Sequence, residues 1–169
     1  MITSNSSPLI HFSKLNLLNL LVEIYETINI PKAVYNDIMA GKEKYYDAML
    51  VERAVYANKI KVIDLDEEYN IMAENLKSFI GDGESEAIAL AKQINTELLV
   101  DDKKARNIAT LMVLEIKTTL SSLLLMLKKD LIDINEYKIC LQKLSKRGWF
   151  SSDVILEYLN AGLNLKKGD

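Results

Sequence analysis

Short apolar or alternating runs recur along this chain between longer segments whose apolar positions repeat every three or four residues. The short runs are typical of strands and the longer period is typical of helices. We predict strands over 1–4, 27–30, 59–64, 96–100 and 113–116. We predict helices over 8–14, 17–24, 31–39 with an end at Gly41, 44–57, 67–79, 84–94 and 103–110, then only helices near 118–129, 134–147 and 151–161.

This alternation of strands and helices predicts an α/β fold, with a central parallel sheet that is flanked by helices on both faces. We expect a single domain over 1–169, with an α/β core over about 1–117 and a helical C-terminal extension over about 118–169. Ligands bind beyond the C-terminal ends of the strands in open parallel sheets. Residues 5–7, the stretch after Ile30 and the pair Asp101 and Asp102 follow predicted strands, so they are the first places to look for a site.

Composition narrows the chemistry that such a site can use. The 169 residues are 49% hydrophobic, include one cysteine and one histidine, and carry a formal net charge of −3. Cys140 reads as a buried helix position, and His11 has no second histidine to act with. Catalysis by a histidine pair or a His/Cys metal cluster is therefore nearly excluded, which leaves carboxylates as the main candidates.

The charge and the hydropathy of the chain also bear on its partners. A net charge of −3 argues against broad electrostatic adhesion to nucleic acid, although it allows an enzyme that holds one phosphate through a metal. No run of about 18 apolar residues suggests a membrane span, and the N-terminus lacks the blocks of a signal peptide. We therefore expect a cytoplasmic protein that does not bind membranes.

Acidic residues gather at the starts of predicted helices, where two interpretations compete. Asp101 and Asp102 can hold a hard cation, or one of them can simply cap the helix that follows. Glu84 and Glu86 lie in the first turn after a Gly-Asp-Gly segment, where acids also interact favourably with the helix dipole. Asp37 falls on the polar flank of its helix and could be an ordinary surface acid.

A family resemblance changes the weight of these alternatives. Four segments occur in order along the chain: 4–10 (SNSSPLI), 30–38 (IPKAVYNDI), 83–91 (GESEAIALA) and 98–106 (LLVDDKKAR). Together they resemble the PIN (PilT N-terminal) domain family, in particular its uncharacterised PIN-like branch related to VapC toxins. Residues 119–132 and 141–162 resemble that branch as well, so that the likeness covers essentially the whole chain.

The resemblance implies a metal-dependent ribonuclease in which acids from four chain regions meet at the edge of the sheet. By position, Asn5, Asp37, Glu86 and Asp102 would be the metal ligands, and Asp101 would be an accessory catalytic acid beside Asp37, Glu86 and Asp102. Mg²⁺ or Mn²⁺ would suit these oxygen ligands. Asn5 stands where the family normally has Asp, which keeps an oxygen but removes one negative charge.

Other residues near these acids could contact the substrate. The family resemblance implies that Ser6 or Ser7 helps to shape the metal or phosphate environment. Lys103, Lys104 and Arg106 could hold a neighbouring phosphate, although they could also be a solvated helix face. A nucleophilic Ser6 or Ser7 with a basic His11 is a weak alternative, and no Gly-rich nucleotide-binding loop is present.

The resemblance further implies an RNA substrate, a cognate antitoxin and a homodimer. It predicts the toxin of a type II toxin–antitoxin pair. The competing hypothesis is a catalytically weakened or inactive PIN fold that serves as a binding or regulatory protein.

Overall fold

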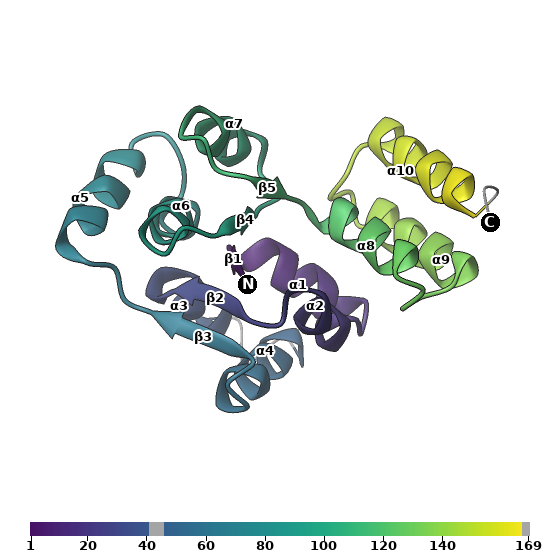
Figure 1. The fold of residues 1–169 in the computed structure, drawn as a ribbon, viewed down its shortest axis with the longest axis horizontal. Coiled ribbons are helices and arrows are strands. Elements are labelled where there is room, and N and C mark those ends of the chain that lie inside the picture. The colour runs from purple at the N-terminus through teal and green to yellow at the C-terminus, as the bar shows by residue number, and fades with distance from the viewer. Residues whose placement is uncertain (41–45, 167–169) are drawn as a thin grey trace. The chain divides into compact units, whose positions relative to one another are not determined.

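The computed structural model describes residues 1–40 and 46–166. The chain forms two compact units, Met1–Thr118 and Thr119–Asp169, and each is described by itself below. The first unit carries the sheet, and the second consists of helices (Figure 1). Among the described helices, none has the length and apolar character that crossing a bilayer would require.

The described part of the first unit contains five parallel strands in the order β3-β2-β1-β4-β5. The strands are β1 (Ile2–Ser4), β2 (Ile28–Pro31), β3 (Ile60–Ile63), β4 (Glu97–Leu99) and β5 (Ile116–Lys117). The helices of this unit are α1 (Ser6–Lys14), α2 (Leu18–Tyr25), α3 (Lys32–Ala40), α4 (Tyr46–Tyr56), α5 (Glu67–Leu76), α6 (Asp82–Gln93) and α7 (Lys103–Leu111). The predicted α/β fold with a helix-flanked parallel sheet is confirmed.

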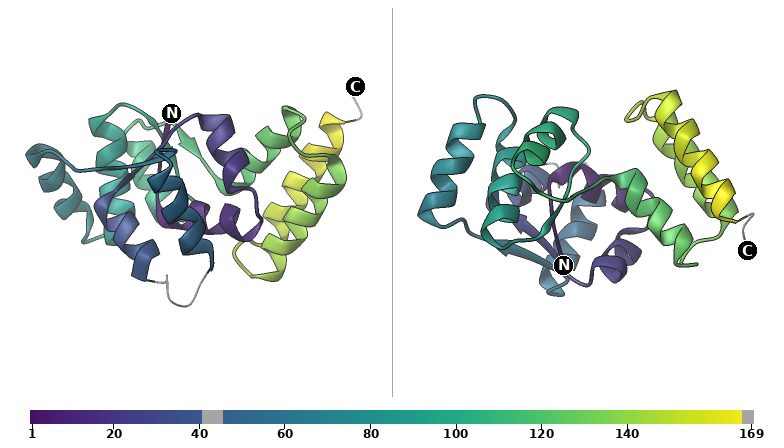
Figure 2. Two further views of the ribbon diagram at one scale, coloured as in Figure 1. Left: turned by 90° about the horizontal axis from the view of Figure 1, so that it is seen from below. Right: turned by 45° about the horizontal axis from the view of Figure 1, so that its top comes forward.

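The strand order reverses its direction at β1, and this places helices on both faces. The chain moves one way from β1 to β3 and the other way from β4 to β5, and right-handed crossovers then put the two sets of helices on opposite faces. Accordingly, α1 packs on α4, whereas α6 packs on α5, α7 and three strands, and α3 contacts both α1 and α6. Figure 2 shows these helices around the sheet in two further views. The point of reversal, between the ends of β1 and β4, is where such sheets bind ligands.

The ends of β1 and β4 lie side by side because the register brings them level. Ser4 pairs with Leu99, and the Asn5 backbone N–H donates a 3.3 Å hydrogen bond to the Leu99 carbonyl. The core beneath is aliphatic and fully buried, with Ile2, Ile88 and Leu98 among its members. This buried aliphatic core therefore supports the loops that follow the two strands.

Several predicted element boundaries are wrong. Pro31 is the last residue of β2 and not the first of a helix. The helix after Gly81 begins at Asp82, so that the expected loop is its first turn. The last strand covers only Ile116–Lys117, because Val113 has a positive φ of 58° and ends a turn. The predicted helix end at Gly41 and helix start at Lys44 lie outside the described residues.

The second unit packs α8 (Thr119–Lys128), α9 (Ile134–Lys146) and α10 (Ser152–Leu165) around a small core. Tyr137 is fully buried, and its hydroxyl donates a 2.7 Å hydrogen bond to the Tyr158 carbonyl. Cys140 is 3% exposed on α9, which confirms the predicted buried helix position, and burial raises the pKa of its thiol to about 11. This thiol is therefore structural.

Candidate metal and nucleic-acid site

Asn5 is buried at the end of β1, and its side chain bonds across the sheet edge. It occupies the N-cap position of α1 but caps no backbone N–H there. Instead its Nδ2 donates a 3.1 Å hydrogen bond to Glu84 Oε1. Its Oδ1 is buried with no hydrogen-bond partner. An orphaned buried oxygen costs about 1–3 kcal/mol, so its place at a strand end calls for a functional explanation.

Glu84 reaches Asn5 because the backbone leaves room for its carboxylate at the start of α6. Gly81 is the N-cap of that helix, and a Cβ at Gly81 would lie 2.6 Å from Glu84 Oε2. The Ser85 hydroxyl donates a 2.8 Å hydrogen bond to the Gly81 carbonyl and so holds the turn in place. The first turn of α6 therefore presents a carboxylate to the end of β1.

Asp101 and Asp102 follow β4 and play different structural parts. Asp102 caps α7, and its Oδ1 accepts a 2.8 Å hydrogen bond from the Ala105 backbone N–H. The second oxygen of this exposed carboxylate is left for a ligand. Asp101 is only 10% exposed, and its Oδ2 lies 3.0 Å from Nδ1 of His11 on α1. The two neighbouring acids thus point to different surroundings.

Glu86 and Asp37, the remaining predicted metal ligands, belong to α6 and α3, two helices that pack on one another. Glu86 Oε2 accepts a 2.9 Å hydrogen bond from the Ala33 backbone N–H at the start of α3. Asp37 is exposed on the second turn of the same helix. The roles predicted for both acids, and for Asp101 as a catalytic acid, stay predictions.

The predicted substrate contacts also separate into groups. Ser6 is buried in the first turn of α1, and Ser7 is half-buried beside it. Lys103 and Lys104 are exposed on the first turn of α7. Arg106 is half-buried on the next turn, and its Nε is buried without a hydrogen-bond partner. Of these residues, only Lys104 lines the cavity described next.

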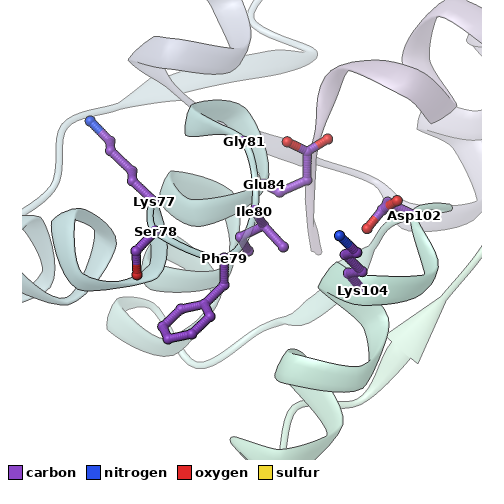
Figure 3. Close-up of a pocket in the computed structure, with 8 residues that line it drawn as sticks. All are labelled: Lys77, Ser78, Phe79, Ile80, Gly81, Glu84, Asp102 and Lys104. Atoms are coloured by element: carbon purple, nitrogen blue, oxygen red, sulfur yellow. The ribbon is translucent and has the colours of Figure 1, made fainter.

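A polar cavity of about 490 Å³ opens at this edge of the sheet. Figure 3 shows the Glu84 and Asp102 carboxylates on one side of it, with Lys104 beside Asp102. The loop between α5 and α6 forms the other side. The lining residues are Lys77, Ser78, Phe79, Ile80, Gly81, Glu84, Asp102 and Lys104. The cavity therefore combines two carboxylates with two cations.

The donor chemistry of this cavity fits a hard divalent cation with few protein ligands. Mg²⁺ usually binds one or two carboxylates, keeps several waters and completes its shell with substrate phosphates. Glu84 and Asp102 can supply the two carboxylates, and the orphaned Asn5 Oδ1 is a third oxygen nearby. Within the described residues, no three His, Cys, Asp or Glu side chains gather into a metal-binding group. The residues do not fit a cation enclosed by four acids.

Comparison with known proteins decides the family. A family model described as a PIN domain matches residues 1–162. The chain belongs to the PIN-domain family. A search of the curated proteins gives no significant match. PIN domains are generally nucleases that typically use divalent metals, so this is a nuclease-type fold, and the family implies binding of nucleic acid.

Glu84 was not among the predicted metal ligands of this PIN domain. Glu86 was predicted, and it directly precedes the apolar stripe of α6. However, Glu84 comes three, four and seven residues before Ala87, Ile88 and Ala91, which are all buried. Glu86 stands three and four residues before Ala89 and Leu90, which are also buried, so the periodicity alone does not choose between the two acids.

Proposed function

We propose that this PIN domain is an endoribonuclease that hydrolyses RNA phosphodiesters with Mg²⁺ or Mn²⁺. The observation that carries the proposal is the pair of carboxylates, Glu84 and Asp102, that line one polar cavity where β1 and β4 end. The helices α1, α6 and α7 all begin at this edge, and their N-termini favour bound anions such as phosphate.

In this proposal the residues of the chain divide the work among themselves. Glu84 and Asp102 hold the cation, and Asn5 fixes the rotamer of Glu84 through its 3.1 Å hydrogen bond. A divalent cation at this place makes water more acidic and offsets negative charge on a phosphodiester. Lys104, beside Asp102, binds a phosphate oxygen of the substrate.

The other predicted acids have supporting parts in the proposal. Glu86 anchors the start of α3 through the Ala33 N–H, and its charge contributes to the raised pKa of Lys77. Asp101 is held by His11, so that it orients the loop between β4 and α7. Asp37 is exposed on α3, where water and substrate phosphates could reach its carboxylate. Removal of Asp37 is expected to lower activity less than removal of Glu84.

The test is metal binding and RNA cleavage with matched isosteric variants. We expect the purified protein to bind Mn²⁺ in calorimetry and to cut single-stranded RNA, with activity abolished by EDTA. Glu84→Gln and Asp102→Asn should each lower Mn²⁺ affinity and cleavage by tenfold or more. Glu67→Gln on the exposed start of α5 is the control and should change neither. Wild-type levels of binding and cleavage in both site variants would refute the proposal.

The biological role that we infer is that of a toxin in a type II toxin–antitoxin pair. The resemblance to VapC-related proteins supports this role, together with a cytoplasmic location, a cognate antitoxin and a homodimer. Expression without the neighbouring antitoxin gene should arrest growth, and the Asp102→Asn variant should not. Sedimentation equilibrium of the purified chain measures the dimer directly. Normal growth under full expression would count against the toxin role.

A second candidate is a PIN fold that binds a partner without catalysis. Two observations favour it: Asn5 stands at the position of an acid, and no group of three acids gathers in the described residues. This candidate predicts no Mn²⁺ binding and no RNA cleavage by the wild-type protein. The same calorimetric and cleavage experiments therefore separate the two functions.

A further inference from the structure

Phe79 is an exposed aromatic side chain on the wall of the catalytic cavity. It is 68% exposed in the turn between α5 and α6, and it lines the same cavity as Glu84 and Asp102. In Figure 3 its ring extends outward from the loop, on the side away from the two carboxylates. A ligand that covers this ring would remove its apolar surface from water, which is favourable.

The turn that carries Phe79 is held in place before any ligand binds. The Phe79 backbone N–H donates a 2.9 Å hydrogen bond to the Leu76 carbonyl, and the Ile80 N–H donates to the same oxygen at 3.2 Å. The Ser78 hydroxyl donates a 3.0 Å hydrogen bond to the Asn75 carbonyl. These hydrogen bonds hold the backbone of Phe79 in place, which lowers the entropic cost when a ligand binds to its ring.

Two lysines line the same cavity as the carboxylate pair. Lys104 lies beside Asp102, and Lys77 comes from the turn that also carries Phe79. A hydrogen bond with Glu74 raises the pKa of Lys77, with further help from the charges of Asp82 and Glu86, so Lys77 stays fully charged at neutral pH. Two positive charges about a metal-binding centre suit a backbone with successive phosphates.

We propose that Phe79 stacks on one base of single-stranded RNA while Lys77 and Lys104 hold phosphates of the same strand. This inference rests on the proposed ribonuclease function and names the form of RNA that the site accepts. A ring can stack on a base only when that base has left its neighbours, as in single strands and loops. A paired duplex keeps its bases stacked inside, so Phe79 discriminates against it.

The test measures binding and cleavage separately for a set of Phe79 variants. Fluorescence anisotropy measures the binding of each protein variant to a fluorescein-labelled, unstructured RNA 12-mer and to a duplex of the same length. The titrations are done in EDTA, and also in Mn²⁺ with variants that carry Asp102→Asn in addition, so that the RNA is not cut. Phe79→Ala should weaken binding of the single strand by about tenfold, within the range that loss of one base–aromatic stack gives. Phe79→Trp should retain it, and Phe79→Leu should behave like Phe79→Ala.

Two matched controls define the background of the binding assay. Tyr56→Ala removes an 80% exposed aromatic at the end of α4, next to the opposite edge of the sheet, and should leave binding unchanged. Lys59→Ala removes an exposed cation near the start of β3 and controls for Lys77→Ala and Lys104→Ala. Lys77→Ala and Lys104→Ala should each reduce the number of counterions released on RNA binding by about one, as measured from the salt dependence of the affinity.

The outcomes separate this inference from the proposed function. If the wild type cuts RNA but Phe79→Ala has the same affinity and KM, stacking is overturned and the ribonuclease stands. If the wild type binds single strands through Phe79 but never cuts them, stacking stands and the ribonuclease fails. Equal affinity for duplex and single strand, or full retention in Phe79→Leu, also overturns the inference, because a protein-docking residue would need only an apolar side chain.

Discussion

Replacement of Asn5 with aspartate should make the stability of the sheet edge depend on pH and on metal. In the wild type the Asn5 amide donates to Glu84 across 3.1 Å. Asn5→Asp replaces this bond with two like charges at the same separation. At an effective dielectric constant of 20, their repulsion is about 5 kcal/mol, from 332 divided by 20 and by 3.1.

Proton uptake limits the cost of this repulsion. One carboxyl of the pair can take a proton at pH 7, which costs roughly 4 kcal/mol for an ordinary pKa near 4 and restores a donor toward the other. The folded variant therefore has a carboxyl whose pKa is raised above its unfolded value. Its stability is fully present below about pH 4 and is lost as the pH rises through the folded pKa. The deficit should be about 4 kcal/mol at pH 7 and about 1.4 kcal/mol at pH 5.

Urea unfolding in EDTA, followed by far-ultraviolet circular dichroism at pH 5 and pH 7, measures this deficit. Saturating Mn²⁺ should return much of the lost stability at pH 7, because a cation between the carboxylates replaces repulsion with attraction. The double variant Asn5→Asp/Glu84→Gln exchanges the amide and the acid, so it should recover stability without metal. A single variant that is as stable as wild type at pH 7 in EDTA would show that the two side chains do not interact.

Three further changes test the description of both units. Gly81→Ala should lower Mn²⁺ affinity and RNA cleavage tenfold or more, because the new Cβ displaces the Glu84 carboxylate. The free energy of unfolding should be nearly unchanged, and metal titration together with thermal melting measures the two effects separately. Gly162→Ala should destabilise the second unit by about 1–3 kcal/mol, because its Cβ would overlap the Tyr137 ring. Fluorescence of the single tryptophan, which lies in that unit, measures this loss of stability. Cys140 should react with a thiol reagent about a hundredfold more slowly than a free cysteine at pH 8, because its pKa rises from 9.0 to about 11. The stability that this protonated thiol contributes is complete below pH 9 and is lost as the pH passes 11.

The fold was predictable from the sequence because its main signals are local. Helical spacing at 84–94 reflects the buried face of α6, and alternation at 59–64 marks β3, although only Ile60 is buried within that strand. The errors fall where local preference and tertiary pairing compete. Pro31 suits the first turn of a helix, but it pairs with Ile63 and so extends β2. Val113 is β-branched, yet its left-handed backbone belongs to the turn after α7.

The candidate site was predictable only as far as the chain regions that build it. The residues after β1 and β4 meet as expected, since the strand order brings their ends together. The choice between Glu84 and Glu86 depended on which oxygen the neighbouring elements leave free. The Ala33 N–H takes up one oxygen of Glu86, a contact between residues 53 positions apart that no local pattern indicates. Phe79 was not predicted as a site residue because an aromatic at the end of a predicted helix carries no periodic signal of its own.

The hydrogen bond between Asn5 and Glu84 depends on residue 5 having an amide and not a negative charge. Two acids at 3.1 Å would need a proton or a cation between them, whereas an amide and an acid form a favourable pair by themselves. The first unit can therefore hold Glu84 in position in the absence of metal. In the proposed function, a cation would meet a carboxylate that Asn5 already holds in position, but it would be attracted by one negative charge fewer. Weaker metal affinity and a preorganised site thus have the same cause, so Asn5→Asp should raise Mn²⁺ affinity while it lowers the stability of the metal-free protein.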